Sequence, residues 1–130
     1  MLTILSDEEL IAAASALVGL YQPSSNCVSG TVASALRTRS GRIYTGICVD
    51  TAGSMGFCAE HAAMAEMLKA REAEVETIVA VSGDAGIIAP CGRCREFLWQ
   101  VHPSNRATRV ILSSDRTITL AELLPEPWQS

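Results

Sequence analysis

A length of 130 residues allows one hydrophobic core and predicts a single domain over residues 1–130. The 10 basic and 14 acidic residues give a net charge of −4 with scattered arginines, which argues against a nucleic acid polymer as partner and favours a small free substrate. Although 48% of the residues are hydrophobic, no apolar run approaches the roughly 20 residues that span a bilayer, so we expect no membrane partner.

The N-terminal part of the chain predicts a helix. Residues 1–5 are mostly apolar and acidic residues follow closely, which is not the pattern of a signal peptide, so we expect a cytoplasmic protein. Ser6 and Glu9 form a predicted capping box. Apolar residues at helical spacing then extend the predicted helix from Asp7 to Leu20, and residues 23–26 predict a turn or loop.

The next two stretches predict a β-hairpin. Thr31–Thr38 and Arg42–Asp50 are rich in β-branched and aromatic residues, and the segment between them, residues 39–41, ends in a glycine. The two glycines of residues 51–56 predict a loop. This loop delivers the chain to Cys58.

Two helices are predicted to begin at cysteines. Good helix formers follow Cys58, and the predicted helix ends within residues 70–73. Cys91 opens a second helix that ends near His102, because apolar residues recur there at helical spacing. Free amides and the helix dipole favour negative charge at such N-termini, where Cys58 and Glu60 both fall.

Strands complete the pattern. Apolar runs predict strands at Thr77–Ser82 and Arg109–Leu112, with a turn at residues 83–86 after the first. Thr119 and Glu122 form a second predicted capping box before a short helix. This alternation predicts an α/β fold in which helices cover both faces of a mixed sheet.

Three thiols and a carboxylate form the candidate site. Cys91 and Cys94 can coordinate one metal ion from a single turn of the chain, and Cys58 can supply a third ligand. Catalytic zinc sites keep three protein ligands and a water, so we interpret the fourth position as water although His61 directly follows Glu60. The Cys91–Cys94 pair alone also suits a structural zinc half-site or a redox pair, but the addition of Cys58 and Glu60 favours catalytic zinc.

Cys58-Ala59-Glu60 followed by Pro90-Cys91-Gly92-Arg93-Cys94 resembles the signature of the zinc-dependent cytidine deaminase family. A cysteine as first ligand resembles the small three-cysteine branch that acts on free nucleosides, and residues 40–46 resemble the hairpin ahead of the family's first motif. Within the family, residues 102–103 and 122–125 are most similar to blasticidin S deaminase. The resemblance implies a three-layer α/β/α cytidine deaminase-like fold, one zinc ion per subunit on Cys58, Cys91 and Cys94, and a homotetramer with sites near subunit boundaries.

The implied reaction is hydrolytic deamination of cytidine, deoxycytidine or a cytosine nucleoside antibiotic such as blasticidin S. Zinc lowers the pKa of a bound water towards about 7, which provides a hydroxide to attack C4 of the ring. We assign the proton shuttle to ring N3 and the leaving nitrogen to Glu60. The alternatives are a deaminase of another small aminated heterocycle, or a zinc-binding relative without turnover. A thioredoxin-like oxidoreductase would leave Cys58 and Glu60 unexplained.

The family resemblance also implies substrate contacts. Family members usually carry Asn-x-Glu on the second hairpin strand, where this chain has Cys48-Val49-Asp50. Asp50 can accept a hydrogen bond from a sugar hydroxyl, whereas Cys48 cannot replace an asparagine amide. The remaining predicted contacts are Cys27 (in place of a ring-packing aromatic), Ala59, the Ala89 carbonyl and a pocket-closing Trp128. Buried thiols at Cys27 and Cys48, and simple tail docking of Trp128, are the structural alternatives.

The charge of the site needs an offset, because three thiolates and one zinc ion sum to −1. Positive groups nearby would restore the Lewis acidity of the metal. Many family members carry an arginine directly after the catalytic glutamate, where this chain has His61. We hypothesise that Arg93 or Arg95 takes over part of this role, with help from His61.

Overall fold

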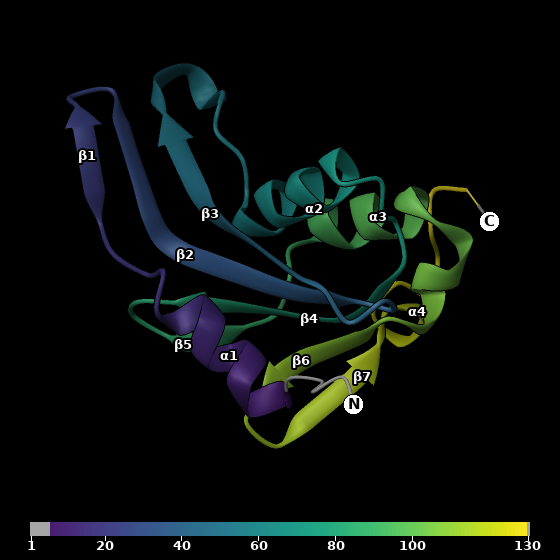
Figure 1. Cartoon of the computed structure of the whole chain (residues 1–130). Coiled ribbons are helices and arrows are strands. Elements are labelled where there is room, and N and C mark those ends of the chain that lie inside the picture. Colours follow the sequence, from purple (N-terminus) through teal and green to yellow (C-terminus); the bar gives the residue numbers. More distant parts are fainter. Residues whose placement is uncertain (1–5, 130) are drawn as a thin grey trace.

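The structure, a computed structural model, describes residues 6–129, in which one sheet lies between helices (Figure 1). Its strands are β1 (Tyr21–Ser24), β2 (Cys27–Thr38), β3 (Ile43–Thr51), β4 (Val75–Ser82), β5 (Gly86–Ile88), β6 (Arg109–Ser113) and β7 (Arg116–Thr119). Its helices are α1 (Asp7–Ser15), α2 (Ala59–Lys69), α3 (Gly92–Val101) and α4 (Leu120–Leu123), with 3-10 turns at Ala52–Ser54 and Pro103–Ala107. Across residues 6–129, no helix combines the length and apolarity that crossing a bilayer requires.

The long strand β2 organises the sheet. It pairs antiparallel with β3 on one side, and on the other side with β1 near its start and with β4 from Val32 onward. β4 pairs in turn with β5 and, in parallel, with β6, which pairs antiparallel with β7. The sheet is therefore mixed, as predicted. The tips of β1, β2 and β3 reach out beyond the helices (Figure 1).

Both faces of the sheet are buried. Leu36 of β2 packs in one cluster with Met64 of α2, whereas its neighbour Ala35 packs in another with Leu10 of α1. Successive residues of a strand point to opposite faces, so α1 covers one face while α2, α3 and α4 lie on the other. The predicted three-layer α/β/α architecture is confirmed.

Several elements differ from the sequence-based expectation. α1 ends at Ser15 instead of Leu20, because the chain turns there and the amide of Gly19 donates to the carbonyl of Gly30 at 2.8 Å. The expected loop at residues 23–26 overlaps strand β1, where the outer edge of the sheet tolerates Pro23. Strands β5 and β7 were not predicted. The expectation about residues 1–5 lies outside the described residues.

Both predicted capping boxes are confirmed. The hydroxyl of Ser6 accepts the amide of Glu9 at 3.2 Å, and the Glu9 carboxylate reaches back to the start of α1. The hydroxyl of Thr119 accepts the amide of Glu122 at 3.3 Å in the same way. Each box satisfies amides that the helix itself leaves free.

Asp7 joins α1 to the sheet and carries a pH-dependent share of stability. Its carboxylate accepts a hydrogen bond from Arg109 at 2.6 Å and lies 3.5 Å from Arg37. The hydrogen bond from Arg109 holds the pKa of Asp7 below its ordinary value of 3.8, although partial burial opposes this. A lowered pKa in the folded state means stability that is present above 3.8 and is lost as pH falls through the lower folded value.

We therefore expect Asp7→Asn to reduce the free energy of unfolding by about 1 kcal/mol near neutral pH, the upper range for a partly exposed ion pair. Urea unfolding of both proteins at a series of pH values measures the difference, which should vanish at pH values well below 3.8. Glu8→Gln, an exposed acid in the same helical turn, is the control. A difference that persists unchanged in acid would contradict the assignment.

Candidate metal and catalytic site

The two cysteine motifs meet between α2 and α3. The Sγ atoms of Cys58 and Cys91 are 3.5 Å apart, and those of Cys91 and Cys94 are 3.4 Å apart. The ligand atoms of Cys58, His61 and Cys94 all lie within 4.8 Å of one another. Sulfurs at about 2.3 Å from one tetrahedral zinc ion are separated by roughly 3.8 Å. The three thiols thus have nearly the spacing of a zinc ligand set.

Helix capping explains why the thiols face one another. Cys58 and Cys91 are the N-cap residues of α2 and α3, each with extended backbone, and neither thiol caps its own helix. Both side chains therefore remain available to the space between the two helices. The free amides of two helix N-termini add positive potential there, which favours thiolates.

Glu60 is buried beside the thiols. Its side chain is only 4% exposed and lines a cavity of about 140 Å³ together with Cys58, Ala59, Ala89 and other residues. Burial raises the pKa of Glu60 above its usual range, although its own backbone amide and the thiol of Cys94 oppose the shift. A carboxyl group with a raised pKa that faces a small cavity is suited to accept a proton from one bound group and pass it to another.

The thiols and Glu60 form an acidic cluster that a cation would stabilise. Burial, followed by contact with Cys91, raises the pKa of the Cys58 thiol. Burial and the Glu60 carboxylate raise that of Cys94. Burial also acts upward on Cys91, but hydrogen bonds from Cys94 and Cys58 hold its pKa below the ordinary value. A divalent ion offsets such crowding of negative groups, and soft thiolate donors together with imidazole suit zinc.

His61 lies against this cluster. Its Nδ1 is 3.2 Å from the sulfur of Cys94, and its ring packs on Phe97 with centroids 4.6 Å apart. Burial, with a smaller contribution from Arg93, lowers the pKa of His61, so the ring is neutral at pH 7. The sequence-based interpretation gave His61 only a supporting role. The sequence did contain a signal for a larger role: His61 comes three residues after Cys58, and residues at this spacing lie on the same side of a helix.

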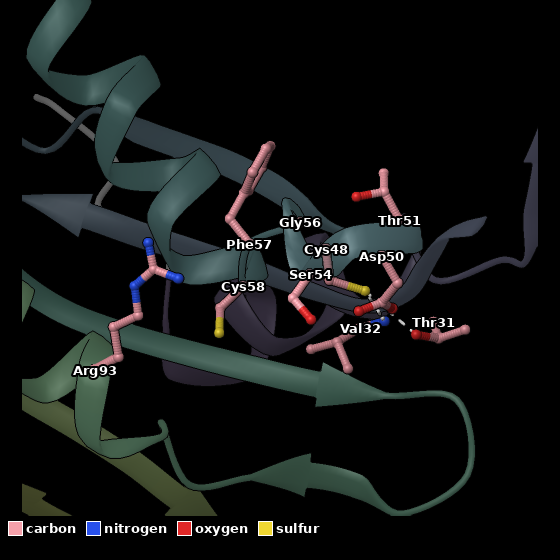
Figure 2. A pocket seen from close by; sticks show the side chains of 10 residues that line it. All are labelled: Thr31, Val32, Cys48, Asp50, Thr51, Ser54, Gly56, Phe57, Cys58 and Arg93. Carbon is pink, nitrogen blue, oxygen red and sulfur yellow. Dashed lines mark hydrogen bonds between the residues drawn. The ribbon is translucent and has the colours of Figure 1, made fainter. Parts of the chain in front are cut away.

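The two arginines proposed to offset the thiolate charge lie in different surroundings. The Arg95 guanidinium donates to the carbonyls of Pro90 and Leu123 at 2.9 and 3.1 Å, so it ties the start of α3 to the end of α4. Arg93 instead lines the pocket that contains Cys58 (Figure 2). Among the two, Arg93 is the one that faces the candidate site.

A wider pocket of about 430 Å³ opens beside the thiols (Figure 2). Cys48, Val32 and Cys58 line both this pocket and the smaller cavity at Glu60, so the two spaces adjoin. The sulfur of Cys48 accepts the amide of Val32 at 3.3 Å and lies 3.2 Å from the hydroxyl of Thr31. Cys48 and Asp50 were predicted here, whereas Thr31, Val32 and Phe57 were not.

Other predicted substrate contacts are divided. Ala59 and Ala89 line the cavity at Glu60. Cys27 is half-buried and lines a separate hollow next to the turn between β1 and β2, which it shares with Asp50. Trp128 is 74% exposed and lines neither the pocket nor the cavity of its own chain; its backbone amide donates to Glu96 at 2.7 Å.

Gly46 of β3 lets α2 approach the sheet closely enough to position the site. A Cβ atom at Gly46 would lie 2.4 Å from the amide nitrogen of Ala63 and 2.7 Å from the carbonyl oxygen of Ala59. We expect Gly46→Ala to lower the free energy of unfolding by about 1–3 kcal/mol through overpacking. Thermal unfolding checks this. Gly19→Ala, where a Cβ meets nothing within 4 Å, is the control, and equal stability of the two variants would contradict the prediction.

A family model and several solved structures relate this chain to the same group of proteins. The family model of the cytidine and deoxycytidylate deaminase zinc-binding region matches residues 6–111. The structure is similar to cytidine deaminase from Burkholderia pseudomallei, with 30% identity, 95% of this chain and 100% of that chain covered, and a TM-score of 0.77. Cytidine deaminase from Mycobacterium leprae is 27% identical, with 94% of this chain and 99% of that chain covered and a TM-score of 0.76. A variant of the Mycobacterium tuberculosis enzyme is 25% identical, with 95% of this chain and 98% of that chain covered and a TM-score of 0.79.

Proposed function

The chain belongs to the cytidine and deoxycytidylate deaminase family, and from this premise we propose that it hydrolytically deaminates a free cytosine nucleoside. The substrate class includes cytidine, deoxycytidine and cytosine nucleoside antibiotics such as blasticidin S. The observation that carries the proposal is the convergence of three thiols, two of which, Cys58 and Cys91, line a small cavity together with the buried Glu60. A purely structural zinc site has no need of such a carboxyl group beside an open cavity.

Cys58, Cys91 and Cys94 would hold one zinc ion per subunit. When bound, zinc supplies an activated water as nucleophile. Glu60 is the group that would move protons: it takes the two protons of the attacking water in turn and delivers one to ring N3 and the other to the amino nitrogen at C4, which leaves as ammonia. Its burial keeps bulk water from competing for these protons.

The two adjoining spaces divide the recognition of the substrate. The cavity of about 140 Å³ suits the flat ring of the base. There the amino group of the ring can donate a hydrogen bond to the Ala89 carbonyl, and the edge of the ring faces the backbone at Ala59. The pocket of about 430 Å³ suits the sugar, and Asp50 and Cys48 line its wall. A ligand that fills both spaces is a nucleoside and not a free base.

Ammonia release by zinc-quantified protein tests this proposal. The substrates are cytidine, deoxycytidine, cytosine and blasticidin S. We expect at least one nucleoside to react and free cytosine to react poorly, because it leaves the wider pocket unused. If none of the four reacts while zinc is bound, the cytosine assignment is wrong, and a deaminase of another aminated heterocycle or an inactive zinc-binding relative takes its place.

Asp50 is the residue to which we assign the sugar hydroxyl. Removal of one hydrogen bond to a charged group weakens binding by about 1.5–3 kcal/mol. We therefore expect Asp50→Ala to raise the KM for the preferred nucleoside by roughly 10- to 100-fold with little change in KM for free cytosine. Asp84→Ala, an exposed aspartate in the turn after β4, is the control. An unchanged nucleoside KM would remove Asp50 from the site.

We also propose that the chain forms a homotetramer. Phe57, His61, Ala62, Ala65 and Phe97 line a groove of about 500 Å³ on the outer side of α2 and α3. Tyr21 and Met55, on the projecting hairpin region, are 66% and 77% exposed. Clustered exposed apolar side chains of this kind mark association surfaces, and we assign a second copy of the chain as occupant. Sedimentation equilibrium would overturn this assignment if the protein is a monomer at micromolar concentration.

The exposed Trp128 fits the same arrangement. It lines neither space beside Glu60 in its own chain. In a tetramer with sites near the subunit boundaries, its indole is available to close the pocket of a neighbour. Trp128→Ala should then raise KM without changing zinc content. An unchanged KM would show that Trp128 does not contact the substrate and only docks the C-terminal tail.

A further inference from the structure

We propose that His61 is a positioning residue for the metal site, donating its Nδ1–H to the thiolate of Cys94 and so replacing, in this chain, the positive group expected beside the thiolates. The inference rests on the proposed zinc ligand set. It differs from the sequence-based hypothesis, which assigned this work mainly to Arg93 or Arg95.

Distance and packing fix the ring in place. Nδ1 lies 3.2 Å from the sulfur of Cys94, within hydrogen-bond range for a sulfur acceptor. The amide of His61 donates to the Cys58 carbonyl at 3.1 Å, and the ring packs on Phe97 at a tilt of 51°. The side chain is 9% exposed. The imidazole therefore has little freedom to choose another partner.

The tautomer follows from the surroundings of the second nitrogen. Nε2 of His61 is buried and has no hydrogen-bond partner among residues 6–129. With the proton on Nε2, that N–H would be buried without an acceptor while the Nδ1 lone pair faced a thiolate. With the proton on Nδ1, the thiolate gains a charge-assisted hydrogen bond. The second arrangement satisfies the donor and is the one we assign.

A role as fourth ligand fits less well. Coordination by His61 in addition to three thiolates would close the position that a catalytic site keeps open. The 3.2 Å between Nδ1 and the Cys94 sulfur is within the range of a hydrogen bond to sulfur.

The bond has a consequence for the metal. Three thiolates and one zinc ion carry a net charge of −1, and a donor on one sulfur withdraws part of that charge. Outer-shell partners of this kind typically change metal affinity by about 10- to 100-fold.

Two substitutions separate hydrogen bonding from packing. His61→Asn keeps an N–H donor near the position of Nδ1, whereas His61→Leu keeps bulk without a donor. We expect the leucine variant to bind zinc about 10- to 100-fold more weakly in chelator competition and the asparagine variant to stay within about threefold of the unsubstituted protein. Phe97→Leu, which removes the ring contact but not the donor, should also stay within about threefold. If the leucine variant does not fold, His61→Ala takes its place.

A spectroscopic readout makes the test independent of any substrate. In the cobalt-substituted protein, the thiolate-to-metal charge-transfer band should move to lower energy in the leucine variant and return in the asparagine variant. Equal zinc affinity in the leucine variant and the unsubstituted protein would overturn the proposal. So would equal weakening in the leucine and asparagine variants, or a change of coordination number on loss of the imidazole. These outcomes concern the metal alone, so they are distinct from a failure of the nucleoside assignment.

Discussion

Replacement of Glu60 by glutamine is expected to lower kcat for the preferred nucleoside by about 10²- to 10⁴-fold, the range that general acid–base catalysis contributes. Glu60 is buried, with only 4% of its surface exposed, and glutamine has nearly the same size, so the substitution leaves no hole in the protein. The amide cannot take up a proton and pass it to ring N3. The loss should therefore appear in kcat, with the protein still folded and zinc still bound.

Steady-state kinetics on zinc-quantified protein measures this effect. Glu66→Gln is the matched control, because Glu66 is on the same helix α2 but is exposed. Near-normal turnover by the Glu60 variant would show that another group moves the protons. Loss of zinc together with activity would instead make Glu60 part of the metal site.

Replacement of Cys91 by serine is expected to weaken zinc binding by more than the roughly 10- to 100-fold that outer-shell changes produce. The sulfur of Cys91 lies 3.5 Å from that of Cys58 and 3.4 Å from that of Cys94, so its loss removes one corner of the ligand set. Serine has almost the same shape, but its hydroxyl is not a thiolate donor. Activity should fall with zinc content.

The thermal stability of the protein provides a second readout. Zinc at 100 times its dissociation constant stabilises the folded state by about 2.7 kcal/mol. We expect this gain in the unsubstituted protein and in Cys27→Ser, whose half-buried cysteine lines a separate hollow. It should be absent in Cys91→Ser. A Cys91 variant that retains zinc and its stabilisation would remove Cys91 from the ligand set.

The elements that sequence patterns predicted are those with a strong local signal. The capping box at Ser6 and the apolar run from Thr77 led directly to α1 and β4. The strands β1, β5 and β7 were missed because each has only three or four residues and pairs at an edge or short extension of the sheet. Their pairing depends on backbone partners distant in sequence, which no local periodicity reports.

The site divides in the same way. The spacing of Cys58, Glu60, Cys91 and Cys94 was enough to expect one cluster, and the structure brings these residues together. In the wall of the wider pocket, Cys48 and Asp50 were predicted, but the contacts from Thr31, Val32 and Phe57 could not be. These contacts depend on the register between β2 and β3, which sets Val32 and Cys48 beside the thiols and leaves Cys27 at the start of β2, in a separate hollow.

Isotope incorporation tests the central claim most directly. Zinc-loaded and chelator-stripped protein are incubated with cytidine, and in parallel with blasticidin S, in water enriched in ¹⁸O, and the products are examined by mass spectrometry. Zinc-dependent hydrolytic deamination predicts a deaminated product that carries one solvent oxygen, formed only by the zinc-loaded protein and restored when zinc is returned. If fully zinc-loaded protein forms neither deaminated product, zinc-dependent deamination of a cytosine nucleoside is contradicted.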